Sequence, residues 1–135
     1  MQEEFTAWVK LAFASTATLL TSLLGDWDAA INILVIIIAC DYITGVSRAF
    51  FEKKLSSEIG ARGIVKKVMI FVVVILASQL DKFLPADVAI VRTATIYFYV
   101  ANEGLSILEN LTIMGIPLPT ALKDKLMQVQ KDKNL

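Results

Sequence analysis

The chain has 135 residues, 56% of them hydrophobic, and its 13 basic residues balance its 13 acidic ones, so the formal net charge is zero. A soluble domain of this size usually carries more charge and fewer apolar residues, so the composition indicates a membrane protein. Without a basic excess to neutralise phosphates, we expect no nucleic-acid partner. Histidine is absent and Cys40 is the only cysteine, which excludes an ordinary zinc site and a histidine-based triad. We therefore expect no enzyme activity, no metal and no cofactor.

Residues 5–24 form the first apolar segment, which we interpret either as a membrane span or as a helix lying at the interface. Small residues recur in it at helical spacing, and such a stripe lets helices approach closely in lipid. The stripe consists of Ala14, Thr18, Thr21 and Gly25. The turn that follows, up to Asp28, contains no Lys or Arg.

The strongest membrane signal is the apolar run from Ala29 to Phe51. As a helix it is about 35 Å long, enough to cross a bilayer core of about 30 Å. A polar connector follows over residues 52–63, and basic residues continue into the next apolar run. Positive charge after a span marks its cytoplasmic end. The residues expected to set this topology are Lys53, Lys54, Arg62, Lys66 and Lys67.

Two more apolar segments, residues 64–84 and 88–109, are separated by a break at Pro85. Residues 110–135 are polar and basic, and Leu122, Leu126 and Val129 mark a short amphipathic helix. Four spans with both termini in the cytoplasm satisfy the charge of every loop, and three spans do so if residues 5–24 do not cross. We therefore expect one all-α integral membrane domain over residues 1–135, with three or four transmembrane helices (four favoured) and a cytoplasmic tail helix.

Polar side chains inside the predicted spans are the candidate functional residues. Ionisable groups in lipid cost several kcal/mol unless they are paired or hydrated, so by default they suggest function. Asp41 and Glu103 lie at similar depths, about 20 Å from the outer ends of their helices. Thr44 and Gly45 share the face of Asp41 and offer small packing positions. The full polar set is Asp41, Arg48, Arg92, Asn102, Glu103, Ser106 and Glu109.

Two interpretations of this polar set remain open. The side chains pair between helices, Arg48 with Glu103 or Glu109 and Asp41 with Asn102, and such pairs set helix register more than they add stability. Alternatively, they line a water-filled lesion once several copies assemble. The two are compatible if assembly exchanges the partners. A transporter is a weaker third hypothesis, because neither inverted repeats nor broken helices are visible.

Three motifs give the chain a family resemblance. They are Asp41-x-x-Thr44-Gly45, Ser56-Ser57-x-x-Gly60-x-x-Gly63-x-x-Lys66, and Asn102-Glu103-x-Leu105-Ser106-Ile107-x-Glu109-Asn110 followed by Gly115-Ile116-Pro117-Leu118-Pro119. Together they resemble the phage holin family that also includes the clostridial toxin-secretion holins. The resemblance implies a protein that oligomerises in the bacterial cytoplasmic membrane and opens lesions that release endolysin or a toxin. Its partners would then be lipid and other copies of itself, with no direct contact required to endolysin.

Two alternatives to a holin come from other functional classes. The first is a non-lytic membrane scaffold or antiholin-like regulator, and the second is a channel for small solutes. Expression in a bacterium separates them, because a holin stops growth and releases a cytoplasmic endolysin. A scaffold does neither, and a narrow channel depolarises the cell without releasing protein.

Overall fold

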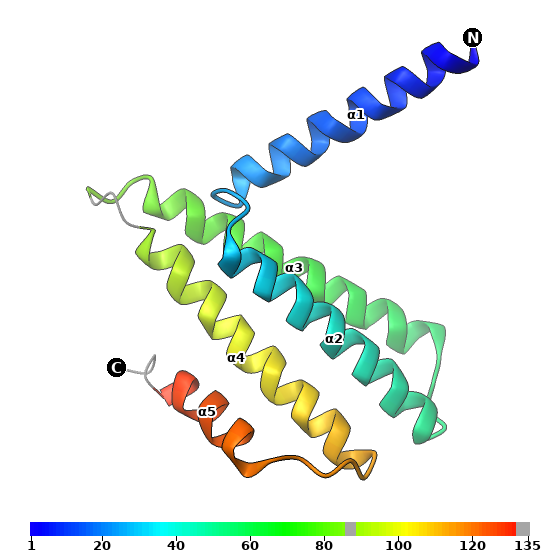
Figure 1. Cartoon of the computed structure of the whole chain (residues 1–135), viewed down its shortest axis with the longest axis vertical. Helices are drawn as coiled ribbons and strands as arrows, with labels where there is room; N and C mark the ends of the chain where they lie inside the picture. Colours follow the sequence, from blue (N-terminus) through cyan, green and yellow to red (C-terminus); the bar gives the residue numbers. More distant parts are fainter. Residues whose placement is uncertain (86–88, 132–135) are drawn as a thin grey trace.

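The computed structural model describes residues 1–85 and 89–131, which contain five helices and no strand (Figure 1). This confirms the all-α class. Val88, the predicted start of the fourth segment, the side chain of Val129 and the end of the predicted tail all lie outside the described part. The helices are α1 (Gln2–Leu23), α2 (Ala29–Phe51), α3 (Ser57–Asp81), α4 (Ile90–Ile113) and α5 (Thr120–Lys131).

Helices α2, α3 and α4 form the body of the molecule, with α4 in contact with both of the others. Helix α5 folds back along α4, whereas α1 projects away from the bundle and buries none of its residues (Figure 1). The core is aliphatic and draws on all three bundle helices and on the residue that follows α1. Its buried members are Leu24, Ile31, Leu34, Ile38, Ile70, Val74 and Ile96.

Side-chain caps start two of the bundle helices. Asp28 is the N-cap of α2, where its Oδ1 accepts the Ile31 N–H at 3.0 Å. Ser56 is the N-cap of α3, where its Oγ accepts the Ile59 N–H at 3.2 Å. Such caps satisfy backbone donors that have no partner within the helix. Because Ser56 starts α3 early, Arg62, which we expected in the polar connector, lies inside α3 instead.

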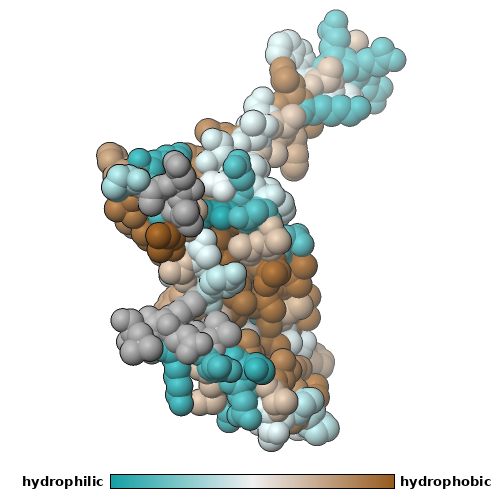
Figure 2. Space-filling view, turned by 60° about the vertical axis from the view of Figure 1, so that its left-hand side comes forward, coloured by the Kyte–Doolittle hydropathy of each residue, from teal (hydrophilic) through white to brown (hydrophobic). Residues whose placement is uncertain are grey.

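The bundle is apolar on its outside as well as in its core. Large aliphatic side chains of α2 and α3 are about half exposed, among them Ile36, Val68, Val72 and Leu76. Figure 2 shows hydrophobic residues along one side of the bundle. By length and composition, α2 is the one helix among residues 1–85 and 89–131 suited to cross a membrane. The further spans remain predictions.

Candidate functional site

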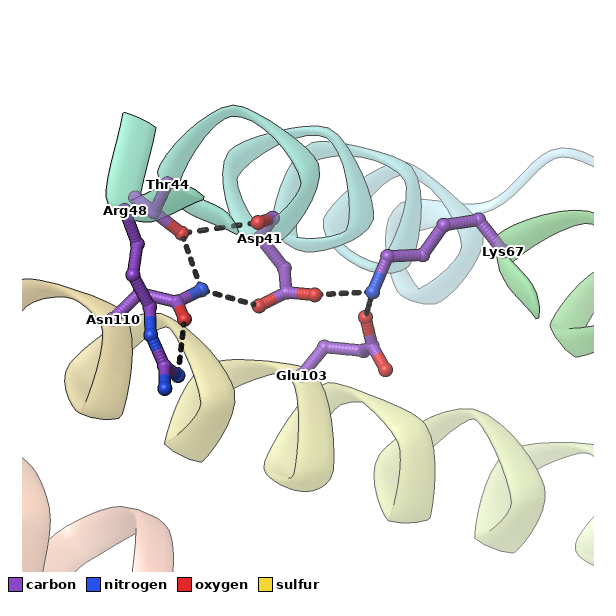
Figure 3. Close-up of polar contacts among 6 residues, drawn as sticks. All are labelled: Asp41, Thr44, Arg48, Lys67, Glu103 and Asn110. Carbon is purple, nitrogen blue, oxygen red and sulfur yellow. Dashed lines mark hydrogen bonds and ion pairs between the residues drawn. The ribbon is translucent and has the colours of Figure 1, made fainter. Parts of the chain in front are cut away.

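Three helices each contribute one charged side chain to an ion triad inside the bundle (Figure 3). The Lys67 ammonium on α3 donates hydrogen bonds to Asp41 on α2 and to Glu103 on α4. The side chains are only 17%, 8% and 14% exposed, respectively. A buried pair of this kind resists separation, because removing one partner leaves the other charge without compensation. The triad therefore ties the three helices together at one level.

Asn110 extends the triad toward the end of α2 (Figure 3). Its Nδ2 donates to Asp41 Oδ1 at 3.4 Å and to Thr44 Oγ1 at 3.1 Å. Its Oδ1 accepts from Arg48 Nη1 at 3.4 Å, and Arg48 also reaches Glu109 at 3.7 Å. The described part of the chain leaves no buried side-chain nitrogen or oxygen without a hydrogen bond. The interior network is thus fully satisfied within one copy.

Arg92 forms a second polar cluster at the opposite end of the bundle. The side chain is 3% exposed and donates from Nη1 to Asp28 Oδ2 at 2.7 Å. It also donates to two backbone carbonyls of the α1–α2 turn, those of Leu24 and Asp26. The hydrogen bond from Arg92 holds the pKa of the Asp28 carboxyl below its ordinary value. Arg92 therefore fastens this turn to the start of α4.

The α1–α2 turn requires glycine at position 25, because the end of α3 and the start of α4 pack closely against it. Gly25 has φ +77, and a Cβ there would lie 2.6 Å from Ser78 Oγ and 2.9 Å from Arg92 Cδ.

Asp81, the last residue of α3, caps the start of α4. Its carboxylate accepts hydrogen bonds from the N–H groups of Val91 and Arg92 at 2.9 and 2.8 Å. A carboxylate at a helix N-terminus also interacts favourably with the helix dipole. The first turn of α4 is therefore capped by α3.

The remaining predicted residues are more scattered. Ala14 and Thr18 are exposed on α1, and Thr21 is half-buried. Asn102 and Ser106 are half-buried on α4, and a Cβ at Gly45 would lie 3.7 Å from the Asn110 amide nitrogen. The basic residues Lys53, Lys54, Arg62 and Lys66 are exposed, so they are available at a surface.

The structure corrects four details of the predicted pairing. Glu103 pairs with Lys67 and not with Arg48, whereas the alternative pair, Arg48 with Glu109, is present. The amide predicted beside Asp41 is that of Asn102, and the structure places the Asn110 amide there, about two turns further along α4, as a hydrogen-bond donor to Asp41. Arg92 is buried at the opposite end of the bundle, where it binds the turn before α2, and it takes no part in the ion triad.

The fourth correction concerns Lys67, which was predicted among the basic residues that set the topology but lies in the interior ion triad. The lysine could have been found by counting. Asp41 lies ten residues before the end of α2, and Lys67 lies ten residues after the start of α3. Two antiparallel helices joined by a short turn bring such positions to the same level. The signal was obscured because Lys66 and Lys67 adjoin the other basic residues.

Tyr42 is a packing residue that the sequence motifs did not reveal. Its ring lies against the glycines of α3, where a Cβ at Gly63 would be 3.3 Å from Tyr42 Cε2 and one at Gly60 3.4 Å from its hydroxyl. A cavity of about 170 Å³ between α2 and α3 is lined by these residues together with Asp41 and Lys67. Gly60 and Gly63 are spaced so that they share one helical face, and this spacing was the sequence signal for a close contact there.

The site described above is a network of charged and amide side chains. Its polar groups are acids, bases and amides engaged with one another, and no group of three or more His, Cys, Asp or Glu side chains within the described ranges could hold a metal ion. Within one copy, the network holds α2, α3 and α4 together through charge-assisted hydrogen bonds.

Sequence comparisons place these features in a family. The bacteriophage holin family matches residues 18–131. An uncharacterized 14.9 kDa protein from Clostridium perfringens is 41% identical over 131 residues, which cover 97% of this chain and 99% of the relative. A protein named probable holin from Bacillus phage phi105 is 36% identical over 104 residues, 77% of this chain and 76% of the relative. No solved structure matches the chain. The match across most of its length means that this protein belongs to the bacteriophage holin family.

Proposed function

We propose that this protein acts as a holin: it inserts into the bacterial cytoplasmic membrane, assembles with copies of itself and opens lesions through which endolysin leaves the cell. Membership in the bacteriophage holin family supports this function. One structural observation carries the proposal. The charged side chains of Asp41, Lys67 and Glu103 pair inside the bundle, whereas large aliphatic side chains cover its outside. A protein arranged in this way matches lipid on the outside and keeps its charges compensated within.

We propose that α2, α3 and α4 cross the membrane and that α1 supplies a fourth span. Helices α3 and α4 contain charged residues that lower their hydropathy, but Lys67 and Glu103 compensate each other inside the bundle. Lys53 and Lys54 then lie on the cytoplasmic side, and the turns at Gly25 and Phe83 lie outside. The whole chain, residues 1–135, forms a single holin domain in this proposal.

Assembly would use surfaces that are unoccupied in one copy. Helix α1 buries none of its residues and presents Ala14 and Thr18 of the small-residue stripe together with large apolar side chains such as Trp8 and Phe13. Small residues allow close helix contacts in lipid, where packing and interhelical hydrogen bonds drive association. The interior ion triad supplies groups that can exchange partners when copies meet. Lipid and other copies are the direct partners, and endolysin passes through the lesion without binding.

Induced expression in a bacterium, with and without a cytoplasmic endolysin, tests the proposal. We expect an abrupt stop in growth at a reproducible time and release of the endolysin, measured as a rapid fall in culture turbidity. Expression of endolysin alone is the control. Continued growth and intact cells would instead indicate a scaffold or antiholin-like regulator. Loss of membrane potential without escape of a cytoplasmic reporter protein would indicate a channel for small solutes.

A further inference from the structure

Helix α5 docks on α4 at Gly104, which has no side chain and so leaves a notch in the surface of α4. It follows a turn that includes Gly115, which has φ +80, and then runs back along α4 (Figure 1). Leu126 fills the space above Gly104, where a Cβ would lie 3.1 Å from Leu126 Cδ2. Gly104 is buried, and α4 is the one helix of the described chain that α5 contacts extensively. The contact therefore fixes how far α5 reaches along the bundle.

The notch lies at the level of the ion triad. Gly104 directly follows Glu103, the partner of Lys67, and precedes the end of α4 at Ile113 by nine residues, or about 14 Å. Leu126 therefore lies at the same level, and the end of α5, at Lys131, lies about 7 Å further along α4. If α4 crosses the membrane, as proposed above, the docked α5 lies within the thickness of the bilayer.

The outer face of α5 is too polar for lipid. Lys123, Asp124, Lys125 and Gln128 are all exposed. Figure 2 shows hydrophilic residues gathered over this part of the molecule, beside the grey C-terminal residues, while the neighbouring flank is hydrophobic. Charged side chains at bilayer depth face water or a partner, because lipid cannot solvate them. The bundle thus has one face suited to water and one suited to lipid.

We propose that the α4–α5 face lines the aqueous lumen of the lesion, with α5 remaining docked on α4 and the outer faces of α2 and α3 turned to lipid. This inference rests on the proposed function, because it assigns the inner wall of the same lesion. It names Lys123, Asp124, Lys125 and Gln128 as lumen residues and Leu126 as the anchor that holds them there. The alternative is a tail that leaves α4 and stays in the cytoplasm when copies assemble.

A disulfide lock distinguishes the two arrangements. In full-length protein carrying C40S, the pair G104C and L126C removes the leucine from the notch and places two thiols where it was. The protein is reconstituted into phosphatidylglycerol–phosphatidylethanolamine vesicles loaded with a folded fluorescent protein. We expect oxidised and reduced samples to release cargo at rates within about two-fold of each other. Each single-cysteine variant serves as a control for the substitution itself. Release that stops on oxidation and returns on reduction would overturn the inference.

The locked protein also shows which way α5 faces. A third cysteine is added as either Q128C or V68C, and its reaction with a water-soluble maleimide is timed in the vesicles. Val68 is the matched control, because it adjoins Lys67 at the same level of the bundle but lies on the apolar outer face. We expect Q128C to react at least about ten-fold faster than V68C. Equal, slow reaction would place α5 against lipid and overturn the inference. If the C40S protein that keeps Gly104 and Leu126 releases no cargo at all, the proposed function fails first and the inference falls with it.

Discussion

Lys67 is a single ammonium placed between two carboxylates, Asp41 and Glu103, and the three side chains come from three different helices. Each carboxylate depends on it, because in a low-dielectric interior an unpaired charge is far more costly than a paired one. Lys66, the next residue along α3, is exposed and has no part in the triad. The two neighbouring lysines therefore differ in role although they are identical in chemistry.

We expect K67M to lower the free energy of unfolding by roughly 3 kcal/mol or more, because it leaves two buried acids without their cation. The matched variant K66M should change it by less than about 0.5 kcal/mol. Thermal unfolding in detergent measures both effects. Adding D41N and E103Q to K67M should restore much of the loss. Equal effects of K66M and K67M would contradict the triad.

Gly25 and Gly115 both have positive φ, but only Gly25 has other side chains close to it. Comparing alanine substitutions at the two positions therefore separates the cost of backbone strain from the cost of a steric clash. Gly115 has φ +80 and nothing within 4 Å of its hypothetical Cβ, so G115A adds only the cost of an alanine in the left-handed region, about 1 kcal/mol. Gly25 has φ +77, and a Cβ added there would also lie only 2.6 Å from Ser78 Oγ. We expect G25A to destabilise the protein by roughly 1–3 kcal/mol more than G115A, in the same unfolding assay. S78A should recover part of the difference, and equal losses would contradict the close packing of this turn.

The Asp28–Arg92 contact should weaken in acid. Arg92 lowers the pKa of Asp28 from its ordinary value of 3.8, so the carboxylate form is favoured in the folded protein. Its stabilising effect is complete above the unfolded-state pKa and is lost as the pH falls through the lowered folded-state pKa. We expect the fluorescence of neighbouring Trp27 to change as the pH is lowered below 3.8. The change should be absent in D28N. The same acid transition in both proteins would show that other groups cause it.

At the scale of the elements, the apolar runs were sufficient to predict α2 but not the start of α3. Both bounds of α2 coincide with its apolar run, because Asp28 caps one end and the run stops at the other. In α3 the polar first turns, with Gly60 and Gly63, favoured a connector by local propensity. The Ser56 cap and the Tyr42 ring packed on these glycines override that preference.

This packing predicts a strong response at Gly63. A leucine there would push the Tyr42 ring away, since even a Cβ lies 3.3 Å from Tyr42 Cε2. We expect G63L to separate the adjoining turns of α2 and α3 and to lower the unfolding free energy by roughly 1–3 kcal/mol. Adding Y42A should restore part of it by making room. The exposed neighbour A61L is the control and should have little effect. A double variant no more stable than G63L would contradict the Tyr42 contact.

At the scale of the whole molecule, the sequence predicted a helical bundle with interior charges, but not which charges meet. The level of Asp41 and Glu103 could be counted along the helices, whereas the choice of Asn110 over Asn102 depends on the rotation of α4 about its axis. Counting residues along α4 gives the level of a side chain but does not give this rotation. The docking of α5 was equally hidden, because it depends on one leucine meeting one buried glycine.

In the proposed function, the bundle crosses the membrane with its charges paired inside, so its two ends face opposite sides. Single-cysteine variants in the C40S protein test this most directly: F83C, in the turn after α3, and K54C, in the turn after α2, both at exposed positions. In intact cells, sampled before growth stops, a membrane-impermeant maleimide should label F83C and leave K54C unlabelled until the cells are broken. Equal labelling of the two variants in intact cells, or labelling of K54C alone, would contradict the account.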